Sequence, residues 1–159
     1  LLARADERQL TVNLTDVDLD YVAAAEVDRL QHISALRVLA TLEPAQVRGA
    51  APALTRVLRN LLDNAARHAS TVIEIRLYTC GTEAVLTVDD DGPGIGVFDR
   101  FVRLDPDRSR SAGGAGLGLA IVREIVAAHG GTATIGESPS GGTRVTSLLP
   151  LSYAPESSR

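Results

Sequence analysis

Two glycine-dense segments constrain the fold of this chain more than any other feature. The first is Asp89-Asp90-Asp91-Gly92-Pro93-Gly94-Ile95-Gly96, and the second is Gly113-Gly114-Ala115-Gly116-Leu117-Gly118-Leu119-Ala120. The first is an acidic turn that follows a predicted strand, and the second leads into an apolar helix. Glycine allows positive φ angles and lets a backbone approach a ligand closely. Together the two segments indicate a nucleotide held by backbone amides.

Composition narrows the ways in which a nucleotide could be held. A chain of 159 residues suits one domain, and a net charge of −4 without a basic tract argues against nucleic acid as the main partner. All sixteen cationic residues are arginine, which excludes both a Walker A loop and the strand lysine of the protein-kinase fold. The single cysteine, Cys80, forms no disulfide within the chain. We therefore expect a reduced, cytoplasmic setting, with Cys80 as a small buried side chain.

Hydrophobic periodicity predicts strands and helices, with several strands following one another at hairpin spacing. We expect an α+β fold: a two-layer sandwich in which a mixed, mostly antiparallel sheet of about five strands is covered on one face by about three helices. The two strands on either side of Glu43-Pro44 are expected to be joined by that turn. The expected strands are 10–14, 36–40, 45–48, 71–78, 84–89, 132–136 and 143–149, and the expected helices run from about 18 to 32, from 52 and over 117–129.

The helix that begins at Pro52 carries two asparagines and an arginine on one face. Asn60, Asn64 and Arg67 are predicted to lie opposite an apolar stripe made by Leu54, Leu58, Leu61 and Ala65. An asparagine carbonyl oxygen is a suitable ligand for Mg²⁺, and an arginine one turn further on can fork onto phosphate oxygens. The alternative is an ordinary solvated helix face. Asparagine is a poor former of helix interiors, however, so two on one face need a reason.

The acidic turn suits the base end of a nucleotide. The ionised carboxylate of Asp90 would repel phosphate, but it can accept a hydrogen bond from the exocyclic amino group of adenine. Guanine has a carbonyl at that position and would be repelled. A Ca²⁺ loop is a weak alternative, because the EF-hand spacing and its bidentate glutamate are missing. A plain surface turn is the other, since Asp, Gly and Pro are ordinary turn residues.

The second glycine-dense segment is predicted to bind the phosphate end of the nucleotide. Its free N–H groups at the start of a helix attract phosphate without lysine. Arg108 and Arg110, just before it, are candidates to close over the γ-phosphate, and a flexible charged loop is the alternative. The spacing is not Gly-x-Gly-x-x-Gly, and no strand comes directly before it, which disfavours a dinucleotide-binding fold.

These segments, in this order, resemble the ATP-binding catalytic domain of bacterial sensor histidine kinases. Residues 60–68 match the asparagine box of that family, Asp90-x-Gly92-x-Gly94 an acidic glycine box, 98–104 its phenylalanine box, and Gly141-Gly142-Thr143 its last glycine box. By this resemblance, Asn64 would coordinate Mg²⁺, Asn60 would orient the phosphate end, Arg67 would contact phosphate, and His68 would lie near the ribose or adenine. Asp90 would contact the adenine, supported by Thr143. Further nucleotide contacts would come from Gly92, Gly94, Ile95, Arg108, Arg110, Gly114, Gly116, Leu117, Gly118 and Leu119.

The resemblance implies a function and a set of partners. The domain, 1–150, would bind Mg-ATP in a cleft between helices and a lid and donate the γ-phosphate to a histidine on separate dimerisation helices of the same protein. Residues 1–9 would be a remnant of the linker from those helices, and 151–159 a disordered tail. The fragment would be monomeric and would not phosphorylate itself. The parent protein would be a membrane-bound sensor with this part in the cytoplasm, serving a response regulator.

Two departures from the family pattern stand out. The junction between Gly96 and Val97 lacks several residues that the family usually carries there. His32, His68 and His129 all lack the sequence setting of the family's phosphoacceptor histidine. His129 instead resembles a helix-end histidine that the helix dipole favours.

Three alternative functions remain open at this point. The chain could be a serine kinase of the anti-sigma-factor type from the same superfamily. It could be a gyrase- or chaperone-like ATPase that turns over ATP without a partner. It could also be a nucleotide-sensing binding module with no transfer activity.

Overall fold

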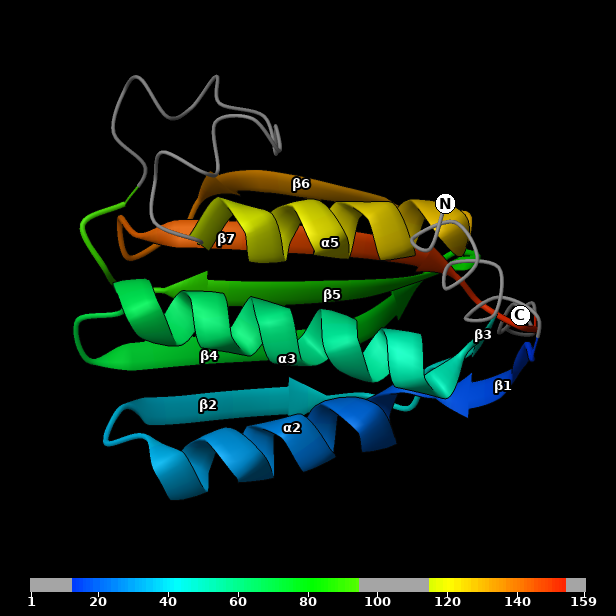
Figure 1. The fold of residues 1–159 in the computed structure, drawn as a ribbon, viewed down its shortest axis with the longest axis horizontal. Helices are drawn as coiled ribbons and strands as arrows, with labels where there is room; N and C mark the ends of the chain where they lie inside the picture. Colours follow the sequence, from blue (N-terminus) through cyan, green and yellow to red (C-terminus); the bar gives the residue numbers. More distant parts are fainter. Residues whose placement is uncertain (1–12, 95–114, 154–159) are drawn as a thin grey trace.

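The computed structural model describes residues 13–94 and 115–153 (Figure 1). Their strands are β1 (Thr15–Asp18), β2 (Arg37–Leu42), β3 (Gln46–Gly49), β4 (Val72–Cys80), β5 (Glu83–Asp90), β6 (Thr132–Glu137) and β7 (Thr143–Pro150). Their helices are α2 (Leu19–Ile33), α3 (Ala51–His68) and α5 (Ala115–Ala128).

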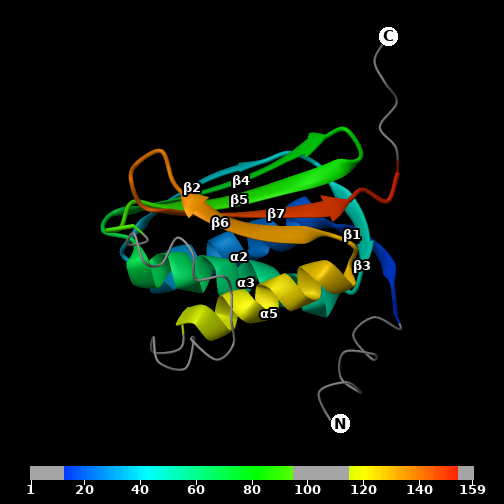
Figure 2. The same ribbon diagram turned by 90° about the horizontal axis from the view of Figure 1, so that it is seen from above.

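A five-stranded mixed sheet forms one layer of the fold. Its strand order is β2-β4-β5-β7-β6; β2 and β4 are parallel, and every other pair is antiparallel. The helices α2, α3 and α5 lie side by side across one face of this sheet (Figures 1 and 2). The predicted α+β architecture is confirmed, and α3 is the middle helix of its layer.

The two strands on either side of Glu43-Pro44 form as predicted, but they do not pair with each other. β2 pairs in parallel with β4, whereas β3 pairs antiparallel with β1 in a separate two-stranded sheet. Each strand buries a valine where it lies: Val38 of β2 beside Ile73 of β4, and Val47 of β3 beside Val17 of β1. Burial of apolar surface, which local periodicity does not report, therefore decides the pairing.

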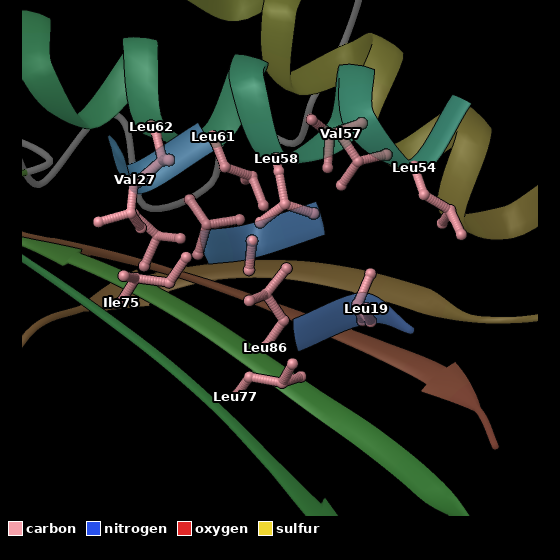
Figure 3. Packing of buried hydrophobic residues seen from close by; sticks show 14 of the residues in the cluster. Leu19, Val27, Leu54, Val57, Leu58, Leu61, Leu62, Ile75, Leu77 and Leu86 are labelled. Atoms are coloured by element: carbon pink, nitrogen blue, oxygen red, sulfur yellow. The ribbon is translucent and has the colours of Figure 1, made fainter. Parts of the chain in front are cut away.

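The core lies between α3 and the inner face of the sheet. Leu54, Leu58 and Leu61 of α3 are almost completely buried, as predicted for its apolar stripe, and they pack toward side chains such as Leu77 and Leu86 from the strands (Figure 3). Burying one such leucine contributes about 1.5–3 kcal/mol. Pro52 lies in the first turn of α3, where its missing N–H costs no hydrogen bond.

Two expectations about peripheral residues are corrected. Cys80 is exposed, because it is the last residue of β4 and pairs with Glu83 beside the hairpin turn instead of lying in the core. The predicted disordered tail begins too early. Leu151 donates a backbone hydrogen bond to the carbonyl of Thr82, and Ser152 donates one to the carbonyl of Gln46. Among the described residues, no helix is both long and apolar enough to cross a membrane.

Candidate nucleotide-binding site

The asparagines of α3 are more buried than their helical pattern predicts. Asn64 is only 6% exposed and Asn60 is half-buried, whereas Arg67 and His68 are exposed at the end of the helix. The alternative interpretation, an ordinary solvated helix face, is therefore wrong for Asn64. The reason is that α3 lies between two other helices above the sheet. A Cβ placed on Gly118 would lie 4.0 Å from the Cβ of Asn60, so the first turns of α5 adjoin this face.

Each asparagine presents a buried polar atom that has no hydrogen-bond partner within the described ranges. These atoms are Nδ2 of Asn60 and Oδ1 of Asn64. Leaving such an atom unpaired costs about 1–3 kcal/mol, so native structures rarely keep one without a reason. A bound group would satisfy both atoms. The oxygen of Asn64 has the chemistry of a magnesium ligand, and the nitrogen of Asn60 is a donor that suits a phosphate oxygen.

The three consecutive aspartates of the acidic turn bind three different parts of the molecule. Asp89, at the end of β5, lies opposite Arg144 of β7. Its two carboxylate oxygens accept hydrogen bonds of 2.7 Å from Nε and Nη2 of that arginine. The hydrogen bond to Asp89 raises the pKa of Arg144 above its ordinary value. This bidentate pair joins β5 to β7 at the point where the turn leaves the sheet.

Asp90 is 3% exposed and is held in one orientation. Its Oδ1 accepts hydrogen bonds from the backbone N–H of Gly92 at 2.9 Å and of Thr143 at 3.3 Å. Its main-chain carbonyl accepts from the hydroxyls of Ser138 at 2.8 Å and Ser140 at 3.2 Å. Within the described part of the chain, Oδ2 receives no hydrogen bond. The carboxylate is thus oriented by one oxygen and has the other available to a ligand.

Asp91 connects the turn to the loop that follows α3. Its Oδ1 accepts backbone hydrogen bonds from Ser70 and Thr71 at 2.9 Å and from Val72 at 3.1 Å, while its Oδ2 accepts from the Thr71 hydroxyl. These hydrogen bonds, led by the one from the Thr71 side chain, hold the pKa of Asp91 well below its usual range. The acidic turn and the end of α3 therefore form one joined unit.

Close backbone contacts explain why the turn needs its glycines. A Cβ on Gly92 would lie 1.9 Å from the carbonyl oxygen of His68. Gly94 has a φ of +79°, and a Cβ there would lie 2.5 Å from the carbonyl oxygen of Gly141. No other residue fits these positions without moving the backbone. The turn is wedged between the end of α3 and the hairpin that joins β6 to β7.

The other predicted contact residues divide into described and undescribed positions. Thr143 lies against Asp90 through its backbone N–H, as described above. On α5, which begins at Ala115 and so includes Gly116, Leu117 is 53% exposed, whereas Leu119 belongs to the hydrophobic core and its side chain is directed away from solvent. The predictions for the following residues and segments lie outside the described residues: Ile95, the Gly96–Val97 junction, 98–104, Arg108, Arg110 and Gly114.

Sequence reasoning missed the residues that support Asp90 from behind. Ser138 and Ser140 lie in the polar turn directly before Gly141, and they bind the Asp90 carbonyl. A short Ser/Pro/Gly turn is so common that its composition carries no signal of such a role. Only its position next to Gly141-Gly142-Thr143 could have pointed to it.

His129 also has a role that its sequence position did not predict. Its Nδ1 lies 2.8 Å from the carbonyl oxygen of Ile125, and its Nε2 accepts a hydrogen bond of 3.2 Å from the backbone N–H of Ala50. Ala50 is the N-cap residue of α3 and supplies no side-chain cap of its own. His129 directly follows the last residue of α5, which is the helix-end position that the sequence predicted. His129 anchors α5 to the start of α3.

Comparison with known proteins identifies the family. Residues 49–153 match the family model described as "Histidine kinase-, DNA gyrase B-, and HSP90-like ATPase". The chain is 39% identical to "Sensor protein RstB" of Escherichia coli, covering 94% of this chain and 36% of that protein. It is 44% identical to "Probable sensor histidine kinase TcrY" of Mycobacterium tuberculosis, covering 95% and 34%. A solved structure, "Mycobacterial sensor histidine kinase MprB", aligns with a TM-score of 0.72 and 32% identity over 87% of this chain and 98% of that one.

The chain therefore belongs to the histidine kinase-, DNA gyrase B- and HSP90-like ATPase family. Within that family it is a catalytic ATPase domain of the sensor histidine kinase type, as the resemblance of its motifs predicted. It spans about a third of the length of the curated relatives RstB and TcrY.

Proposed function

We propose that this domain binds Mg-ATP and donates the γ-phosphate to a histidine on a separate dimerisation helix of the same protein. The observation that carries the proposal is the joining of two unlike ligand sites. One oxygen of the Asp90 carboxylate and the buried carbonyl oxygen of Asn64 both lack a described partner. Asp90 lies in the acidic turn and Asn64 lies on α3. Asp91 joins the two, because it binds the loop that follows α3. A purine triphosphate has a base for one site and phosphates for the other.

Asp90 would select the base. Its Oδ1 is already occupied by two backbone N–H groups, so Oδ2 would accept a hydrogen bond from the exocyclic amino group of adenine. Guanine would place a carbonyl oxygen against a buried carboxylate, and the two would repel each other. We therefore expect ATP to bind in strong preference to GTP.

Asn64 and Asn60 would serve the phosphate end. The described residues contain no group of three or more His, Cys, Asp or Glu side chains that could hold a metal ion. A magnesium ion here would take one ligand from Oδ1 of Asn64 and the rest from phosphates and water. When bound, the ion would neutralise charge on the phosphates. Arg67, exposed near the end of α3, would add a phosphate contact, and His68 would lie near the ribose or the adenine.

Transfer would depend on positioning and on charge neutralisation. The asparagines at 60 and 64 stand where hydrolytic relatives would use a carboxylate to activate water, which favours transfer to a partner over hydrolysis. Arg108 and Arg110 are proposed to close over the γ-phosphate. The receiving histidine, the response regulator and the membrane-bound remainder of the sensor would belong to other parts of the system, with this domain in the cytoplasm and monomeric by itself.

A calorimetric titration tests the binding proposal. ATP and GTP are each added with Mg²⁺ and with EDTA in its place. We expect magnesium-dependent ATP binding and weak or absent GTP binding. Equal affinity for both nucleotides, or ATP affinity that is indifferent to magnesium, would contradict the assignment.

Labelled ATP tests the transfer proposal. The isolated domain should carry no radiolabel after incubation, whereas a separately prepared dimerisation segment of the same protein should acquire an acid-labile phosphohistidine. Acid-stable phosphoserine on a protein partner would favour the anti-sigma-factor type of kinase. Rapid phosphate release by the isolated domain would favour a free-standing ATPase, and binding without label on any partner would favour a nucleotide sensor.

A further inference from the structure

A buried carboxylate on α2 connects that helix to α3 through two arginines. Glu26 is 4% exposed. Its Oε2 accepts hydrogen bonds from Nε of Arg29 at 2.6 Å and from Nε of Arg59 at 3.1 Å, and its Oε1 accepts from Nη2 of Arg59 at 2.8 Å. Arg29 also donates to Oδ1 of Asp63 at 2.7 Å. We call these four residues the Glu26 network.

The Glu26 network is ionic at neutral pH. Burial acts to raise the pKa of Glu26, but the hydrogen bonds from Arg59 and Arg29 outweigh it and bring the pKa below its ordinary value. The hydrogen bond to Asp63, opposed by burial and reinforced by Glu26, raises the pKa of Arg29. Two negative and two positive side chains thus balance one another between the helices.

The two α3 members of the network directly precede the two asparagines of the nucleotide site. Arg59 precedes Asn60, and Asp63 precedes Asn64. Neighbouring residues on a helix point about 100° apart, and residues four apart lie one above the other. The network therefore holds α3 at two successive turns, along the face next to the one that carries both amides. Two attachments of this kind fix the rotation of α3 about its own axis.

The amides themselves have no described partner that could fix their direction. Nδ2 of Asn60 and Oδ1 of Asn64 are buried and unpaired within the described ranges, so the backbone of α3 must direct them. Glu26 is the buried member of the network, whereas the side chains of Arg29, Asp63 and Arg59 are partly exposed. Pairing a buried carboxylate in this way is a poor source of stability, because apolar residues of similar volume often do as well or better. Its best-attested use is to specify one register between packed elements.

We propose that Glu26 is a positioning residue for the phosphate end of the nucleotide site. Through Arg59 and through Arg29 with Asp63, it sets the rotation of α3 that directs Asn60 and Asn64 toward the bound phosphates and their metal. The inference rests on the proposed function and adds to it a residue on a different helix, outside every motif of the site. Asp90 is less exposed to this rotation, because its own hydrogen bonds come from its turn and the β6–β7 hairpin. The link from the turn to α3 is made by Asp91 and reaches the loop after the last turn of the helix, away from Arg59 and Asp63.

The test uses the variants Glu26→Gln and Arg59→Met, with Asp28→Asn as the matched control. Asp28 is an exposed carboxylate on the same helix, 3.7 Å from His32, and it is not a member of the network. For each protein, calorimetry gives the affinity for ATP with and without Mg²⁺, and an NMR titration gives the affinity for adenosine. Arg59 is at the surface, so Arg59→Met answers the question even if Glu26→Gln folds poorly.

We expect both network variants to weaken Mg-ATP binding by about threefold or more, since substitutions that act through an intervening element change coupling on this scale. The gain in ATP affinity on adding Mg²⁺ should shrink, while adenosine affinity and the control stay at the wild-type level. Unchanged Mg-ATP affinity in both variants would overturn the inference. So would equal weakening of adenosine, which would mark the network as a general stabiliser. Failure of the wild-type chain to bind ATP would instead overturn the proposed function, and this inference with it.

Discussion

The alpha carbon of Gly142 lies against the main chain of Asp90, so closely that a Cβ on residue 142 would be 2.1 Å from the Asp90 carbonyl oxygen and 2.6 Å from its Oδ1. Gly142 therefore packs against Asp90 and limits the orientations that its carboxylate can adopt. The neighbouring residue, Thr143, supplies one of the two N–H groups that Oδ1 accepts. The first residue of β7 thus orients Asp90 while it pairs with Glu137 of β6 in the sheet.

Gly142→Ala should displace Asp90 and weaken the recognition of adenine. Overpacking of this kind costs about 1–3 kcal/mol, so the melting temperature should fall together with the ATP affinity. Thermal unfolding and calorimetry measure the two effects. Gly136→Ala is the control, because a Cβ there meets nothing within 4 Å. Wild-type ATP affinity in Gly142→Ala would contradict the role of Gly142 in orienting Asp90.

Asn64→Ala and Asp90→Asn should separate the two ends of the nucleotide site. Asn64→Ala should reduce ATP affinity mainly when Mg²⁺ is present, because it removes the oxygen proposed as a metal ligand. Asp90→Asn should reduce the preference for ATP over GTP with or without the metal. Each loss should be about 1.5–3 kcal/mol, the range for hydrogen bonds to charged groups. If calorimetry finds both variants at wild-type affinity, the assignment of the site is wrong.

Asp91 should make the stability of the domain depend on pH in the acid range. Its pKa is lowered in the folded state, so its contribution is fully present above the unfolded value of about 3.9 and is lost as the pH falls through the folded value. In Asp91→Asn this proton-linked part is absent. Urea unfolding between pH 3 and pH 7 should therefore show a wild-type advantage that narrows on acidification. A constant difference across that range would contradict the role of Asp91.

Ser147→Ala should leave the domain as stable as before or stabilise it slightly. Ser147 is completely buried in β7, opposite Leu86 and Ala133, and its hydroxyl has no partner within the described residues. Removing an unpaired buried hydroxyl relieves a cost of about 1 kcal/mol or more. Ser138→Ala is the contrast, because that hydroxyl binds the Asp90 carbonyl, and its loss should be destabilising. Chemical unfolding that ranks the two variants in the opposite order would refute this.

Local patterns predicted most elements of the fold and were less informative about their neighbours. The first strand is an exception, because β1 is Thr15–Asp18 and not the predicted 10–14, and residues 13 and 14 are not in a strand. The apolar stripe of α3 follows from helical spacing alone, and the β4–β5 hairpin from two strand patterns around a glycine turn. The parallel pairing of β2 with β4 could not be predicted in this way. It joins residues that are about a helix and a strand apart in sequence, and hydrophobic alternation carries no information on which strand lies alongside.

The site shows the same division between residue type and surroundings. Asn60, Asn64 and Asp90 could be chosen from their chemistry and spacing. The burial of Asn64 could not, because one apolar stripe does not reveal that helices flank α3 on both sides. The hydrogen bonds of Asp91 to Ser70, Thr71 and Val72 link segments about twenty residues apart, and nothing in a run of three aspartates distinguishes the members from one another.

The pairing of Leu151 with Val47 has a practical consequence. It secures the last described residues to β3, whose other neighbour is β1, the first described strand. Both ends of the described chain therefore meet at one pole of the molecule, and the turn at Gly94 lies at the opposite pole (Figure 1). A fluorescent reporter attached at Leu14 or Tyr153, which are exposed near the two ends of the described chain, would thus lie far from the proposed nucleotide site.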